Sequence, residues 1–148
     1  AQPRGPASGR CTADGEKRSP SIAWKATPTD AAAIILIVED ADAPAPTPLV
    51  HTLAWALPGG DAELAEGALC SPGSGGEPIS LGRDSFFGAE DLSPDPPPGH
   101  GPHRYAFQVF ALDSPPDLHG KPIRTQVVHA IKDHVIAKGM LIGTYERV

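Results

Sequence analysis

The chain has 148 residues and a formal charge of −6, a length that suits one ordinary domain with a single substantial core. The acidic balance excludes the basic footprint of a nucleic-acid-binding domain. The longest apolar stretch, residues 31–38, is far shorter than the roughly 20 residues that cross a bilayer, so we expect no integral membrane association. The 18 prolines and 16 glycines between apolar runs favour a folded, turn-rich β domain.

The first half of the chain predicts a flexible arm followed by two long strands. Residues 1–10 are polar and punctuated by proline and glycine, and residues 22–24 form a short buried edge. Residues 32–39 are continuously apolar and β-branched, which indicates a central strand covered on both faces. Residues 50–57 predict a second strand in which His51 shares a face with Trp55, because side chains alternate along a strand.

The second half predicts a long loop region, one strand, one helix and a closing strand. Residues 58–101 are dominated by loops, and residues 104–113 alternate as a strand does. In residues 125–138 apolar side chains recur at helical spacing, and Gly139 follows as a C-terminal stop. Residues 140–145 predict the closing strand. The expected fold is mainly β, with one C-terminal helix, in a single domain spanning residues 1–148.

Acidic side chains follow the central strand directly. Asp40 and Asp42 are two residues apart, so they share a face if the extended backbone continues, and Pro44 then ends the strand. Such acidic residues serve either as ligand-site groups or as solvated turn formers.

Two histidines are the candidate partners of these aspartates. His51 follows a proline-rich loop, and His103 lies beside Gly99 and Gly101, whose presence suggests backbone held close to something else. Arg104 should point to the opposite face and pair with a carboxylate. We interpret His100 as a turn residue, and expect the remaining histidines, His119, His129 and His134, at surface or helix-packing positions.

Other chemistries have weaker support in the sequence. Two carboxylates and two imidazoles suit a transition metal, but their spacing is not the helical spacing of many metal sites, so we expect no metal. No nucleophile elbow and no phosphate-binding loop of the Gly-Lys-Ser/Thr type is present. Cys11 and Cys70 fit neither a zinc site nor a disulfide framework, and leave one disulfide or two free thiols as alternatives.

The order of motifs resembles the phosphatidylethanolamine-binding protein family, most closely its bacterial, Raf kinase inhibitor-like branch. The resemblance extends from Cys11 to Arg147. It is carried by CTADGEKRSPSIAW, LIVEDADAP, the strand with His51, DSFFG, PPPGHGPHRYAFQVFALD and IKDHVIAKGMLIGTYER. The two signatures are the Asp-x-Asp-x-Pro and Gly-x-His-Arg-Tyr elements. The chain departs from the family at Ala41, where a proline is usual, at Asp84, where an asparagine is common, and at Asp95, where the bacterial pattern has a cysteine.

The resemblance implies a large central sheet, a smaller second sheet and a small pocket for phosphate, acetate or a phospholipid headgroup. By motif, the lining residues are Asp40, Asp42, Pro44, His51, His103 and Tyr105. We expect the two aspartates to orient the two histidines toward one anion, whose affinity falls as the imidazoles lose protons at rising pH. No cofactor and no catalytic residue is implied.

Three functions remain open at this point. The first is a non-enzymatic binding module for small anions or phosphorylated headgroups, with a regulatory role toward a kinase or protease partner as in some relatives. The second is an enzyme that uses an Asp/His pair for acid-base chemistry in the same pocket. The third is a structural interaction surface on the proline-rich loop at residues 94–102. The printed chain shows no targeting segment, so cytoplasmic and periplasmic or secreted locations both remain, as do monomer and dimer.

Overall fold

The computed structural model describes residues 19–69, 79–85 and 96–146. Residues 1–10, Cys11 and Cys70 lie outside this part of the chain, so the predictions about a flexible arm and a disulfide are not addressed by it. Among the described helices, none is long and apolar enough to span a membrane.

A five-stranded antiparallel sheet forms the centre of the molecule, in the order β5-β3-β2-β6-β7. Its strands are β2 (Ala33–Asp40), β3 (Leu49–Pro58), β5 (Ser80–Leu81), β6 (His103–Leu112) and β7 (Val135–Tyr145). β1 (Ile22–Trp24) and β4 (Ala62–Leu64) pair as a smaller antiparallel sheet. The expected mainly β fold with two sheets is confirmed.

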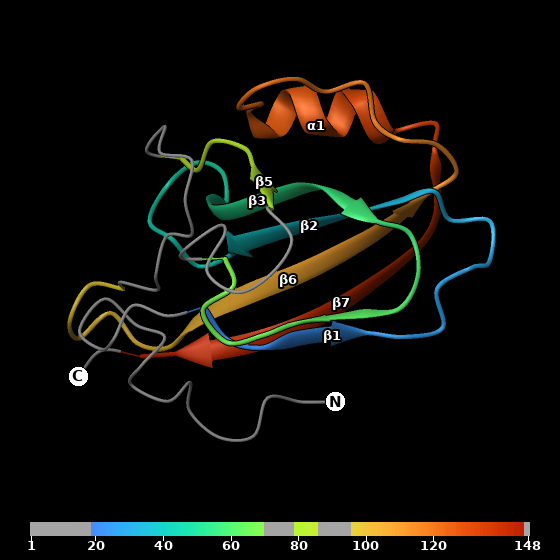
Figure 1. Ribbon diagram of the computed structural model, residues 1–148. Helices are drawn as coiled ribbons and strands as arrows, with labels where there is room; N and C mark the ends of the chain where they lie inside the picture. Colours follow the sequence, from blue (N-terminus) through green and yellow to red (C-terminus); the bar gives the residue numbers. More distant parts are fainter. Residues whose placement is uncertain (1–18, 70–78, 86–95, 147–148) are drawn as a thin grey trace.

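β2 is the middle strand of this sheet, and every one of its residues is buried. A strand covered on both faces needs apolar side chains on both, which the continuous run of alanine, isoleucine, leucine and valine supplies. Ile34, Leu36 and Val38 pack toward the smaller sheet, in one apolar cluster with Ile22. Residues of the opposite face pack in a second cluster with the helix. Figure 1 shows the large sheet between these two covering elements.

The helix α1 (Arg124–Ile131) is shorter than the sequence predicts. Its buried side chains are Val127 and Ile131, and the amide of Ile123 is bound by the side chain of Gln126 at 3.0 Å. The prediction of a helix over residues 125–138 is wrong in its second half, because Val135 opens β7 and pairs with Leu112 of β6. β-Branched residues suit either structure locally, and pairing along the whole of β6 decides for the strand. Gly139 therefore lies inside β7 and does not end the helix.

β3 departs from regular pairing at two β-bulges. Val38 and Glu39 of β2 pair with Thr52 and Val50, which leaves His51 as the extra residue. The second irregularity falls near Trp55 and Ala56, and Ala56 has a positive φ of 62°. A bulge turns the following side chains to the other face. Trp55 packs with the helix-side cluster, whereas His51 lies against Tyr105 on the opposite face, so the prediction that His51 and Trp55 share a face is wrong.

Candidate functional site

The candidate site lies where β2 ends beside the start of β6. Asp40, the last residue of β2, is paired with Tyr105, and His103 is the first residue of β6. Residues two apart on a strand share a face, so His103 and Tyr105 both project toward the side that carries the smaller sheet. Asp40, His103 and Tyr105 are all buried.

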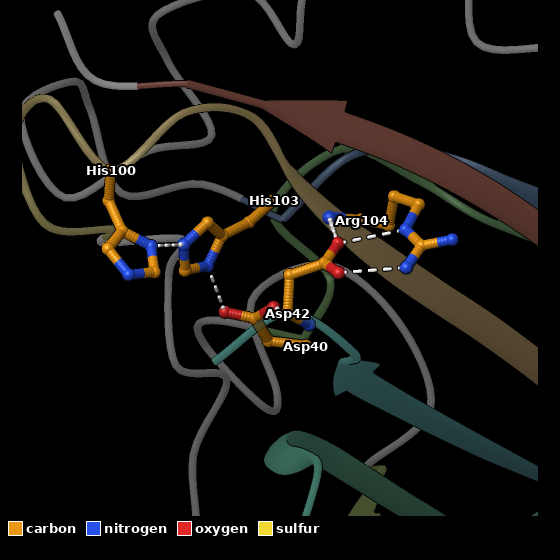
Figure 2. Close-up of polar contacts among 5 residues, drawn as sticks. All are labelled: Asp40, Asp42, His100, His103 and Arg104. Carbon is orange, nitrogen blue, oxygen red and sulfur yellow. Dashed lines mark hydrogen bonds and ion pairs between the residues drawn. The ribbon is translucent and has the colours of Figure 1, made fainter. Parts of the chain in front are cut away.

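A chain of polar contacts runs from Asp40 through His103 to His100. Nδ1 of His103 lies 2.7 Å from Oδ2 of Asp40, in a pair whose side chains are 2% and 6% exposed. Nε2 of His103 lies 2.8 Å from Nδ1 of His100, whose residue is exposed. Figure 2 shows both contacts, with the ring of His103 between His100 and Asp40. Because an ionised carboxylate only accepts hydrogen bonds, Nδ1 of His103 carries the proton in this pair.

Asp42 is held by Arg104 and not by a histidine. The Arg104 backbone amide donates to Oδ2 of Asp42 at 2.7 Å, and its guanidinium donates to both carboxylate oxygens at 2.9 and 2.8 Å (Figure 2). The side-chain hydrogen bond to Arg104 is the main reason why the pKa of Asp42 is far below its usual range, and the same bond raises the pKa of Arg104. The expected pairing of Arg104 with a carboxylate is confirmed.

The backbone turns between the two aspartates instead of continuing as a strand. The amide of Asp42 donates to Oδ1 of Asp40 at 2.9 Å, which is the local hydrogen bond of an aspartate turn. The two carboxylates therefore have different partners. One carboxylate oxygen of Asp40 orients His103, while Asp42 fixes the loop to the start of β6.

His51 reaches the site from β3 through the bulge. Its ring meets that of Tyr105 edge to face, with centroids 5.3 Å apart and planes at 87°. Nε2 of His51 and the hydroxyl of Tyr105 are both buried. Bulges often re-aim a side chain beside a functional site, and this one brings a second imidazole to the face that carries His103.

The surrounding loops place the remaining sequence candidates. Pro44 is exposed in the turn after β2. On the other side of β3, the hydroxyl of Ser85 accepts from the Val50 amide at 2.7 Å, and the Ser85 amide donates to the Val50 carbonyl at 3.0 Å. Asp84, beside it, is buried. The structure thus brings Asp40, His51, His103 and Tyr105 together, sets Asp42 beside them with Arg104, and leaves Pro44 exposed.

His100 is the site residue that sequence reasoning missed. The sequence predicts a turn residue, and His100 does lie in a turn, but its ring contacts the ring of His103, with centroids 5.0 Å apart. The available signal was a second histidine three positions from His103, framed by two glycines. Gly99 and Gly101 have φ values of 72° and 87°, and a β-carbon built on either would meet no described atom within 4 Å beyond its chain neighbours. Their left-handed backbone explains the two glycines without a close contact to another described segment.

The arrangement offers hydrogen-bond donors and acid-base groups. Within the described ranges, no three or more His, Cys, Asp or Glu side chains cluster as metal ligands would. A buried carboxylate that orients an imidazole can support either anion binding by the protonated ring or proton transfer through it.

Comparisons with known proteins give a match to a family model and to curated relatives. The family model described as "Phosphatidylethanolamine-binding protein" matches residues 2–146. A UPF0098 protein of Pyrococcus abyssi is 34% identical over 138 residues, covering 92% of this chain and 76% of the relative. A UPF0098 protein of Methanothermobacter thermautotrophicus is 33% identical over 148 residues, covering 97% and 93%.

Two solved structures share the fold. A putative phosphatidylethanolamine-binding protein homologue from Chlamydia trachomatis superposes with a TM-score of 0.86 at 28% identity, over 97% of this chain and 90% of that one. Escherichia coli YbcL, described as a new member of the mammalian family, superposes with a TM-score of 0.88 at 23% identity, over 99% and 94%.

Proposed function

The chain belongs to the phosphatidylethanolamine-binding protein family, and from this we propose that it is a non-enzymatic module that binds a small anion or the phosphate of a headgroup. The buried pair of Asp40 and His103 carries the proposal. Asp40 accepts a hydrogen bond from Nδ1–H of His103, so a protonated His103 has one remaining N–H, at Nε2, to offer an anion. The negative charge of Asp40 also offsets the cost of burying that imidazolium.

The other candidates support this centre in different ways. His51 and Tyr105 add a second imidazole and a hydroxyl on the same face, and both groups can donate to oxyanions. Asp42 and Arg104 hold the loop after β2 against β6. In this proposal Pro44, which is exposed in that loop, lies at the edge of the ligand site. In this proposal Asp40, Asp42, Pro44, His51, His103 and Tyr105 together form the ligand site.

The test is calorimetric titration with inorganic phosphate and with phosphoethanolamine between roughly pH 5.5 and 8.5, around the ordinary histidine value near 6.5. Affinity should fall as pH rises, because an imidazole that loses its second proton no longer donates from Nε2. Asp40→Asn and His103→Ala should each weaken binding at least about tenfold, the effect of one charge-assisted hydrogen bond. Urea unfolding of both variants checks that they fold.

The matched control is His129→Ala, which removes an exposed imidazole of α1 and should leave the titration unchanged. A flat pH profile, or wild-type affinity in folded His103→Ala, would overturn the proposal. Tighter binding of phosphoethanolamine than of phosphate would identify the headgroup as the ligand class. Equal affinity for the two probes would assign recognition to the phosphoryl group alone.

A regulatory role toward a protein partner extends the same chemistry, because a phosphorylated side chain presents the same phosphoryl group. Displacement of phosphate by a phosphoserine peptide, and not by its unphosphorylated form, is the measurement that supports it.

An enzyme is the second candidate, and the chain from Asp40 to His100 favours it, since consecutive hydrogen bonds from a carboxylate through two imidazoles can pass a proton. Turnover of a panel of phosphoesters and carboxylic esters, lost in His103→Ala, would establish this activity. Saturable binding without product supports the module.

A further inference from the structure

His100 covers the only ring nitrogen of His103 that Asp40 does not engage. Nδ1 of His103 is bound to Asp40, and Nε2 lies 2.8 Å from Nδ1 of His100. The His103 side chain is 2% exposed, whereas His100 is an exposed residue. An anion that approaches His103 along its Nε2 direction therefore meets His100 first.

One proton lies between the two rings in the present arrangement. Nitrogens 2.8 Å apart form a hydrogen bond only when one donates and the other accepts. With both rings neutral, Nδ1 of His103 keeps its proton for Asp40, so Nε2 accepts and Nδ1 of His100 donates. When Nε2 of His103 is also protonated, two N–H groups face each other and both need an acceptor.

We propose, building on the function proposed above, that His100 is a second imidazole ligand of the phosphoryl group. The phosphoryl oxygens enter between the two rings and accept from Nε2 of His103 and Nδ1 of His100. The direct contact between the histidines is thereby replaced by two charge-assisted hydrogen bonds to the anion.

The balance of charge around the site favours this second ligand. Asp40 from β2 neutralises one imidazolium, that of His103, and Asp42 is neutralised by Arg104. Among the described residues, His51 from β3 and Tyr105 from β6 lie on the same face, the buried carboxyl of Asp84 follows β5, and His100 comes from the turn. A second protonated imidazole at His100 adds the positive charge that a phosphate with two negative charges needs.

The turn that carries His100 is loosely surrounded at its two glycines. Gly99 and Gly101 flank His100 in left-handed backbone, and a β-carbon built on either would meet no described atom within 4 Å beyond its chain neighbours. His100 is also tied to its own loop by its amide, which donates to the Pro97 carbonyl at 3.2 Å. A small rotation of the exposed ring can therefore separate the rings without unpacking the core.

The experiment compares His100→Ala, His100→Asn and the control His119→Ala by calorimetric titration with inorganic phosphate and phosphoethanolamine. His100→Ala should weaken the binding of both ligands about tenfold, which corresponds to the loss of one hydrogen bond to a charged group. His100→Asn should recover part of the loss, because its amide retains an N–H donor. His119 is exposed and pairs only with Asp117 among the described residues, so its loss should change neither titration.

The outcomes separate this proposal from the one it rests on. Wild-type affinity in His100→Ala together with lost binding in His103→Ala would overturn the role of His100 and keep the anion site. Tighter binding in His100→Ala would also overturn it, since His100 would then only compete with the ligand. If wild-type protein binds neither probe, the function itself fails.

Nitrogen-15 spectra of the histidine rings give a readout that a merely structural role would not move. The spectra are recorded near pH 5.5, below the ordinary histidine value of about 6.5, at the end of the titration where the proposal expects phosphate to bind. Added phosphate should shift the Nδ1 signal of His100. An unchanged His100 signal at saturating phosphate would contradict the proposal.

Discussion

At the level of single residues, the two aspartates of one turn bind different partners. Asp40 and His103 are 63 positions apart and meet as a buried pair at 2.7 Å. Asp42 lies nearer the surface and is bound by the backbone and side chain of Arg104. The first pair sets which nitrogen of His103 can meet a ligand, and the second holds the loop beside it.

The pair of Asp42 and Arg104 predicts a loss of stability in acid. Hydrogen bonds from Arg104 lower the pKa of Asp42, so the folded protein binds this proton less readily than the unfolded chain. The stabilisation is complete above the unfolded carboxyl value of about 3.9 and is lost as pH falls through the folded pKa. The difference in Tm between wild type and Asp42→Asn should therefore be constant above about pH 5 and shrink below about pH 4.

The control for this measurement is Asp133→Asn, at an exposed carboxylate in the turn between α1 and β7. Its effect on Tm should be small throughout. A difference for Asp42→Asn that grows toward acid pH would contradict the assigned sign.

At the scale of elements, β3 is the strand whose irregularity shapes the site. Its pairing with β2 slips at His51 and again near Ala56. Val50 packs with the helix-side cluster, and Ala54 packs with the cluster of the smaller sheet. A regular strand would place these two residues on the same face. Their opposite faces show the bulge at His51, and the His51 ring lies beside Tyr105.

The second bulge predicts a stabilising glycine. Ala56 has a φ of 62°, where a β-carbon is strained and glycine is not. Ala56→Gly should raise the free energy of unfolding by about 0.5–1 kcal/mol, after the greater entropy of glycine in the unfolded chain is subtracted. Ala106→Gly, in the regular part of β6, should lower it by about 0.5–1 kcal/mol. Urea midpoints with unchanged m-values measure both, and destabilisation by Ala56→Gly would contradict the bulge.

At the scale of the whole molecule, neighbouring residues of β2 connect the site to the helix. Asp40 points to His103 on one face of the sheet. Glu39 on the other face accepts from Arg124 at 3.0 Å and from Gln108 at 3.1 Å. Because α1 begins at Arg124, this ion pair ties the start of the helix to the strand end that carries the site.

The docking of α1 predicts opposite behaviour for two adjacent valines. Val127 is fully buried against the sheet and Val128 is 39% exposed. Val127→Ala should lower the free energy of unfolding by about 2–3 kcal/mol, the loss of two buried methyl groups and the cavity they leave. Val128→Ala should change it by less than about 1 kcal/mol. Equal effects in chemical unfolding would mean that the helix docks by another face.

The central strand, the alternating strand of residues 104–113 and the Asp-x-Asp and His-Arg-Tyr elements could all be predicted from the amino-acid sequence. These follow from local features: apolar runs, alternation, and the motifs around proline and glycine. The sequence also predicted correctly that Arg104 pairs with a carboxylate, since alternation sets Arg104 on the face opposite His103.

The end of α1, the direction of the His51 side chain and the contact made by His100 depend instead on how distant segments pack together. Val135 and Ile136 fit a helix by spacing, but they pair as β7 because a long partner, β6, is available. His51 faces Tyr105 because β3 is bulged against β2, and His100 meets His103 because two left-handed glycines fold the turn back. Each of these depends on partners distant in the sequence or on backbone geometry that the periodicity of side chains does not encode.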